Sequence, residues 1–200
     1  MQPPSASPPL PSPLLLAWRA GRRVLGALKR LQLLRQSLRR HSCLLLAGVL
    51  WSPQATLNGR LYRRQDIERE LAAAGSLLLG AFGHPPPGAP CYATPPPLEE
   101  ASHQLAWAWE GDHLVGGLRL LNTPAGAQLL HAVLHGTAVG ASLRGYARLH
   151  PGLGGAVAAD DLQLVTIDVV LHPAGRCALA PYSLEGGPGW LRAFTEPVKQ

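Results

Sequence analysis

The chain has 200 residues, of which 46% are hydrophobic, so it can bury one sizeable core but is too short for two domains of ordinary size. Its three cysteines lie far apart without a CxxC pair or other metal-ligand spacing, which argues against a disulfide framework and a zinc site. The formal net charge of +6 is uneven, because no Asp or Glu precedes Asp66 and most basic residues gather before it.

The beginning of the chain divides by composition into two segments. Residues 1–13 are a Pro/Ser-rich leader that can bury almost nothing, and we expect it to be disordered or extended. In residues 14–41, Leu, Val and Trp recur near helical spacing among Arg and Lys, which predicts a basic amphipathic helix. We expect no membrane span, because the apolar runs are too short, and a transit peptide is a minor alternative. The helix would cap the domain, dock on an acidic surface or be a removed propeptide.

Residues 42–180 alternate apolar segments with Gly and Pro breaks, which predicts one domain of short strands and helices. The strands that we expect cover residues 43–51, 104–110, 113–121 and 162–171. The helices that we expect cover residues 63–74 and about 122–135. The chain after Pro173 is expected to be loop-like, and residues 181–200 are expected to form a C-terminal tail.

A serine in a segment of small residues is a candidate nucleophile. Ser142 lies in VGASLRG, where its hydroxyl would be accessible and where backbone N–H groups near Arg144 and Gly145 could form an oxyanion hole. The alternative is an ordinary serine in a Gly-rich edge strand. A serine nucleophile needs a histidine base and a third group that orients the imidazole.

Asp168 is a candidate for that third group. It interrupts an apolar strand, where an isolated carboxylate is costly unless it is paired, and a histidine would supply the pairing. The alternative is that the side chains of this strand alternate between core and solvent, and that Asp168 lies on the solvent side. Among other histidines, His131 and His135 have the i, i+4 spacing of some zinc sites, but they lack the HExxH pattern and are interpreted as surface or core residues.

Four segments of the chain resemble motifs of the T4-type prohead core proteases of tailed bacteriophages. The segments are NGRLYRR (58–64), LGAFGHPP (79–86), VGASLRG (139–145) and IDVVLHPA (167–174). The resemblance implies that His84 is the base, Ser142 the nucleophile and Asp168 the orienting acid. The chain departs from the family pattern at Ala81, where a Glu is usual.

The resemblance also implies the fold and the supporting residues. We expect an α+β, mostly β fold, similar to the compact antiparallel β-barrel of herpesvirus assemblin surrounded by helices. Arg144 and Gly145 would support the oxyanion, Arg144 through its backbone N–H or through a bound water. For the third member of the triad, Asp161, Asp160 and His172 remain rivals of Asp168.

The function implied by the resemblance is that of a serine endopeptidase that needs no metal or cofactor. It would cleave scaffold and capsid precursors in an assembling prohead in the host cytoplasm, process itself, and form a homodimer. The alternative suggested by Ala81 is an inactive structural or scaffolding protein with the protease fold. Binding to nucleic acid through residues 14–40 is a less favoured third possibility.

Overall fold

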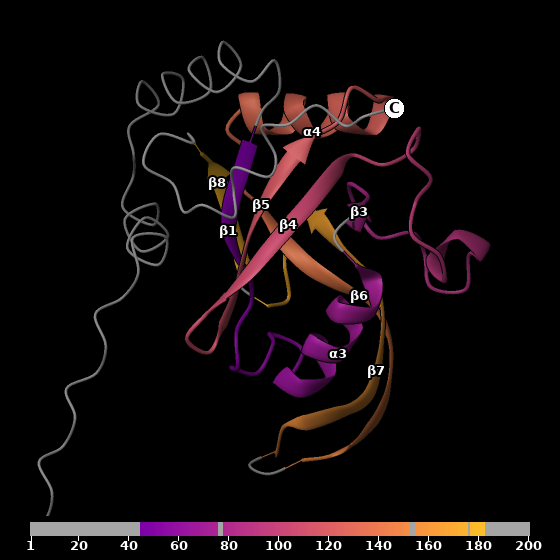
Figure 1. The fold of residues 1–200 in the computed structure, drawn as a ribbon, viewed down its shortest axis with the longest axis vertical. Helices are drawn as coiled ribbons and strands as arrows, with labels where there is room; N and C mark the ends of the chain where they lie inside the picture. Colours follow the sequence, from indigo (N-terminus) through magenta and orange to yellow (C-terminus); the bar gives the residue numbers. More distant parts are fainter. Residues whose placement is uncertain (1–44, 76–77, 153–154, 176, 183–200) are drawn as a thin grey trace, which may run out of the picture.

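The computed structural model describes residues 45–75, 78–152, 155–175 and 177–182 (Figure 1). The leader, the basic segment 14–41 and the tail from residue 183 onward lie outside these described residues. The strands are β1 (Leu45–Trp51), β2 (Arg60–Tyr62), β3 (Leu78–Gly80), β4 (His103–Glu110), β5 (His113–Leu120), β6 (Val139–Pro151), β7 (Val157–Val170) and β8 (Cys177–Pro181). The helical elements are α3 (Arg64–Ala74), η1 (Pro90–Tyr92) and α4 (Pro124–Leu134).

The strands form one eight-stranded sheet in the order β2-β7-β6-β8-β1-β5-β4-β3. Neighbouring strands are antiparallel except for β2 and β7, which run parallel. The centre of the sheet is β1, whose seven residues are all buried, as its continuous apolar sequence predicts. The mostly β fold expected from the sequence is therefore confirmed.

The sheet curls into a half-barrel, and the segment that follows β3 contacts β7. Phe82 forms an isolated parallel bridge to Val169, and Val169 exchanges backbone hydrogen bonds with its neighbours: Gly83 N–H donates to Val169 O at 2.8 Å, and Val169 N–H donates to Ala81 O at 3.0 Å. The same edge of β7 pairs with β2 nearer its start. This closure sets the segment after β3 directly beside the end of β7.

The helices lie at opposite ends of the sheet. Figure 1 shows α4 across the end where β5 finishes, and α3 near the long β6 and β7 strands. The two helices expected within residues 42–180 and the hairpin formed by β4 and β5 are confirmed within a few residues of their predicted ends. Among the described residues, no helix is long and apolar enough to cross a bilayer.

The C-terminal part of the domain differs from expectation, because β8 forms where a loop was predicted. β8 has a sequence of five residues in which Cys177 and Leu179 are buried and Ala178 is exposed, and it inserts between β1 and β6. A segment of only five residues beside Gly175 and Pro173 has too short a pattern to be identified as a strand from its sequence alone. The strand exists because two distant strands offer their backbone groups to it.

The long β6 and β7 strands also exceed the sequence prediction. The Gly-rich segment around Ser142 is a strand of 13 residues, and β7 has 14 residues, beginning five positions before the expected start. Asp160 and Asp161, expected to precede the strand, therefore lie within it. Pairing shifts between Arg144 and Gly145 and again between Tyr146 and Arg148 mark β-bulges, which no local pattern of the sequence reveals.

Replacing Thr123 by Ala should lower the free energy of unfolding by about 1 to 2 kcal/mol. The Thr123 hydroxyl accepts a hydrogen bond from Gly126 N–H at 3.0 Å and donates one to Ala101 O at 2.6 Å, so it both caps α4 and fastens the helix to the chain before β4. Urea unfolding followed by circular dichroism measures the loss. Thr137→Ala, at an exposed position beyond the other end of α4, is the matched control and should change stability little.

Candidate active site

The register of two strands sets Ser142 beside Asp168. These residues are direct partners in the antiparallel pairing of β6 and β7, so their side chains project from the same face of the sheet. Ser142 is partly exposed and lines a cleft, whereas the side chain of Asp168 is fully buried. The alternative in which Asp168 faces solvent is therefore wrong.

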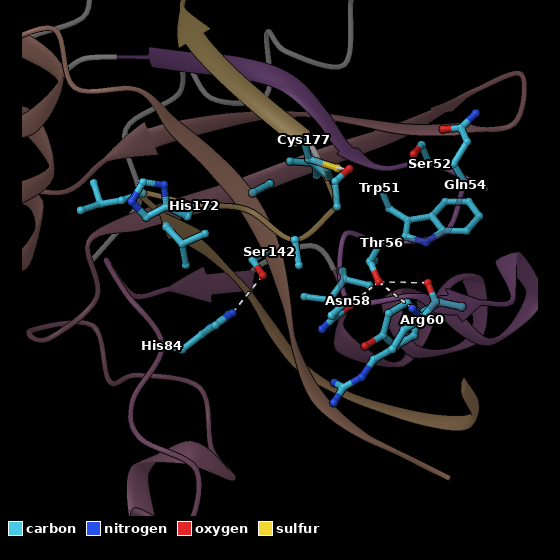
Figure 2. Close-up of a pocket in the computed structure, with 18 of the residues that line it drawn as sticks. Trp51, Ser52, Gln54, Thr56, Asn58, Arg60, His84, Ser142, His172 and Cys177 are labelled. Atoms are coloured by element: carbon cyan, nitrogen blue, oxygen red, sulfur yellow. Dashed lines mark hydrogen bonds between the residues drawn. The ribbon is translucent and has the colours of Figure 1, made fainter. Parts of the chain in front are cut away.

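His84 reaches the same face from the closing segment after β3. Its Nδ1 lies 2.7 Å from Asp168 Oδ2. Its Nε2 lies 2.9 Å from Ser142 Oγ, and Figure 2 shows this second contact. In the neutral tautomer that fits both contacts, Nδ1–H donates to the carboxylate and Nε2 accepts from the serine hydroxyl. Gly83, at φ +87°, turns the chain immediately before the histidine, and Pro85 fixes the backbone after it.

The Asp168 carboxylate is surrounded by donors from two further residues. Ala81 N–H donates to Oδ1 at 2.8 Å, and Arg144 Nε makes a close ion-pair contact with Oδ2 at 2.8 Å. Both charged side chains are almost completely buried, with 0% of Asp168 and 1% of Arg144 exposed. A carboxylate removed from water needs such compensation, because an unpaired buried charge costs several kcal/mol.

Arg144 and Gly145 are placed differently from each other. The Arg144 guanidinium is engaged with Asp168 and with main-chain carbonyl groups of residues 91–94. Gly145 pairs with Leu164 at the bulge, and a Cβ atom at that position would lie 2.3 Å from Gln163 O, so the ladder itself requires glycine. The support of an oxyanion by their backbone N–H groups stays a prediction.

The three rivals of Asp168 lie apart from the His84 ring. Asp160 forms an ion pair with Arg63 at 2.8 Å, and His150 Nε2 lies 3.2 Å from its carboxylate. Asp161 is exposed and lies 3.4 Å from Arg148. His172 lines the cleft near Ser142 (Figure 2). Within the described residues, the acid in contact with His84 is Asp168.

The cleft beside Ser142 has a volume of about 460 Å³. Its walls combine chain segments that are far apart in sequence: the end of β1 with the loop to β2, the residues around His84, β6 at Ser142, and the turn between β7 and β8. Figure 2 shows Trp51, Thr56 and Arg60 across the cleft from His84. Sequence reasoning identified the NGR segment only by resemblance and did not place it in this wall.

His131 and His135 stack on each other along α4. Their rings stack at a centroid distance of 3.9 Å on one side of α4, and His135 Nδ1 lies 2.8 Å from His131 O. Among the described residues, no group of three or more His, Cys, Asp or Glu side chains gathers in a way that could hold a metal ion.

His103 is a buried residue that sequence reasoning missed. Its Nε2 lies 3.1 Å from Ile167 O, and its Nδ1 lies 2.8 Å from Ser102 Oγ. Gly80 makes room for the ring, because a Cβ there would lie 2.3 Å from His103 Nε2. Burial lowers the pKa of His103 from 6.5 to about 4, so the ring is neutral and donates to Ile167, the residue before Asp168. The available signal was a histidine directly before the predicted strand 104–110, at the position where β4 begins.

The stability of the protein should therefore fall between pH 6.5 and pH 4. Since the unfolded chain binds a proton on His103 more readily than the folded one, the stabilisation is fully present above pH 6.5 and is lost as pH falls toward the folded pKa of about 4. This pKa difference corresponds to about 3 kcal/mol. Urea unfolding across this range measures it, and His103→Gln should flatten the dependence.

The exposed His172 provides the control, because His172→Gln should keep the parental slope. An equal slope in parent and His103→Gln would contradict the assignment of the acid sensitivity to the buried ring.

Comparison with known proteins gives a structural match. No protein-family model matches the sequence, and no curated protein matches it. Among solved structures, the chain is similar to the bacteriophage T4 capsid assembly protease, gp21, with a TM-score of 0.54 and 21% identity, over 63% of this chain and 80% of that one. The resemblance predicted from four sequence segments is confirmed at the level of the fold, and the chain is similar in structure to a phage capsid assembly protease.

Proposed function

We propose that this protein is a serine endopeptidase with Ser142 as nucleophile, His84 as general base and Asp168 as the orienting acid. The observation that carries the proposal is the continuous chain of contacts from Ser142 Oγ through the His84 ring to a buried carboxylate, at 2.9 and 2.7 Å, at the wall of an open cleft. A nucleophile, its base and an orienting group within hydrogen-bond reach are the arrangement that acyl transfer by serine requires.

The geometry supports the usual two-step hydrolysis. Ser142 Oγ attacks the scissile carbonyl while His84 Nε2 takes the hydroxyl proton, and the carbonyl carbon forms a bond to Oγ. The imidazolium then gives this proton to the leaving amine as the C–N bond breaks, which leaves an acyl-enzyme. A water molecule, deprotonated by His84, releases the new carboxyl group and restores the serine. Asp168 stabilises the imidazolium in both steps.

The proposed substrates are scaffold and capsid precursors of a tailed bacteriophage, cleaved inside a prohead in the host cytoplasm. The structural likeness to a phage capsid assembly protease supports this setting. We further propose self-processing in the basic segment 14–41 or in residues 181–200, a homodimer, and kinship of the half-barrel with the assemblin barrel. The domain limits of 42–180 belong to the same proposal.

The alternative of an inactive structural protein rested on Ala81, where the related proteases usually carry Glu. In this structure the contact from position 81 to Asp168 comes from the backbone N–H, at 2.8 Å. Because every residue except proline supplies that donor, Ala81 does not weaken the hold on the carboxylate. This observation favours an active enzyme over an inactive descendant.

A fluorophosphonate probe should label the folded protein covalently at Ser142. Ser142→Ala should abolish labelling, and His84→Gln should slow it by about 10³-fold or more, because the base is lost. Labelling is followed by fluorescence after electrophoresis and located by mass spectrometry. Ser52→Ala is the matched control, since Ser52 lines the same cleft and should be dispensable for labelling.

Two outcomes would contradict the proposal: an unlabelled but folded parent, or equal labelling of parent and Ser142→Ala. Co-expression with the scaffold protein of the same phage tests the substrate class separately. Scaffold fragments should appear with the parent and be absent with Ser142→Ala.

A further inference from the structure

We propose that Arg144 is a positioning residue that holds Asp168 ionised and ties the Pro-rich loop after His84 to it, so that loop and triad act as one unit. The inference rests on the proposed function, because it assigns a task within the same site. It gives the Arg144 side chain a task at the Asp168 end of the triad, apart from the oxyanion support expected from the Arg144 backbone N–H.

The first observation concerns the charge. Asp168 has no contact with solvent, and Arg144 brings a permanent positive charge to 2.8 Å from Oδ2 and to 3.5 Å from Oδ1. The other partners of the carboxylate are the neutral Ala81 N–H and the His84 ring. Without Arg144, a buried anion would depend on a histidine that must lose and gain a proton in each cycle. The guanidinium removes that dependence.

The second observation concerns the loop between His84 and β4. Arg144 Nη1 shares its two N–H bonds among three carbonyl oxygens, those of Cys91 at 2.7 Å, Thr94 at 3.1 Å and Tyr92 at 3.2 Å. These residues form the end of η1 and the turn after it, where helical carbonyls lack partners. The loop is rich in proline, which has no N–H to offer them. Arg144 is thus the shared donor at the end of η1.

The same loop contributes to the cleft. Tyr92 lines the cleft beside His84, and its ring meets the ring of Tyr146 edge-on at 5.5 Å. Tyr146 follows Arg144 by two positions on β6, so one strand supports the loop twice. Through these contacts, the position of a cleft wall is coupled to the orientation of Asp168.

The shape of the guanidinium explains the choice of residue. Arg144 places Nε and one terminal nitrogen, Nη2, beside the Asp168 carboxylate, while its other terminal nitrogen, Nη1, faces main-chain carbonyl groups of the loop. A planar fork of five donors can serve both sides at once, whereas the ammonium of lysine is a single point of charge. Lysine would retain the attraction to Asp168 and lose the anchoring of the loop.

The groups that face the Asp168–His84 pair are few. Arg144 faces the pair from β6, and the Ala81 N–H faces it from the segment after β3. The buried His103 faces it from β4 and is neutral, because burial lowers its pKa to about 4. His172 belongs to the cleft wall. Among the described residues, Arg144 is therefore the permanent cation that acts on this pair, and its removal should make the pair bind a proton at higher pH.

The experiment measures the rate of fluorophosphonate labelling from pH 5 to pH 10 for the parent and for Arg144→Met, Arg144→Lys and Arg148→Met. In Arg144→Met, the acid limb of the pH–rate profile should move to higher pH, and the plateau rate should fall by about 10²-fold from misplacement. In Arg144→Lys, the limb should stay near that of the parent while the plateau falls. Arg148→Met, on the same strand with 79% of its side chain exposed, should match the parent in both respects.

A double-mutant cycle with Asp168→Asn asks whether Arg144 acts through Asp168. If it does, adding Arg144→Met to Asp168→Asn should slow labelling much less than it does in the parent. The inference would be overturned if Arg144→Met kept both the plateau rate and the acid limb of the parent. It would also be overturned if the effects of Arg144→Met and Asp168→Asn on the labelling rate were fully additive. If Arg144→Met does not fold, Arg144→Lys decides, because a parental plateau in that variant would exclude the role of the fork.

Limited proteolysis does not depend on the catalytic activity of the protein, so it separates this inference from the proposed function. Proteinase K should cut the loop at residues 88–98 faster in Arg144→Lys and Arg144→Met than in the parent and in Arg148→Met. Faster cutting in a protein that the probe does not label would refute the peptidase and keep the anchoring role. Labelling of the parent together with unchanged cutting and unchanged profiles would refute the anchoring role and keep the peptidase.

Discussion

The buried charge of Asp168 is the constraint around which the site is organised. An ionised carboxylate without solvent must be neutralised by donors held in place, and here they come from β6 through Arg144 and from the segment after β3 through Ala81 and His84. These are the elements that flank β7 once the sheet has curled. The closure of the fold and the electrostatic requirement of the site are thus met by the same contacts.

Strand pairing supplies the precision of the arrangement. Ser142 and Asp168 share a face because they are direct partners, and a slip of one residue in either strand would turn one of them to the other side. His84 enters from the opposite edge of β7, fixed by the Phe82–Val169 bridge. A site built on paired strands holds its geometry better than one built on loops. Arg144 connects the Pro-rich loop at residues 88–98 to these paired strands.

Sequence patterns predicted the elements whose signals are local, and missed those that depend on distant partners. The apolar run of β1 and the alternation around Gly111 are visible in single segments, whereas β8 is defined by its pairing with β1 and β6. The meeting of His84, Ser142 and Asp168 was predicted from resemblance to a family. The Arg144–Asp168 ion pair was not predicted. Alternation along the strand places Arg144 on the face of Ser142, but its meeting with Asp168 depends on the register of β6 against β7, which no local pattern of the sequence reveals.

The energetic cost of the site is itself an argument about function. Buried ion pairs contribute little to stability, since desolvation offsets much of the attraction, and well-packed apolar residues of similar volume are often as stable or more so. For stability alone, a scaffold with this fold would not need Arg144 and Asp168 in its core. Their arrangement beside a partly exposed His84 and an accessible Ser142 is explained by a task that needs a fixed anion next to a histidine. Proton transfer in the proposed peptide hydrolysis is such a task.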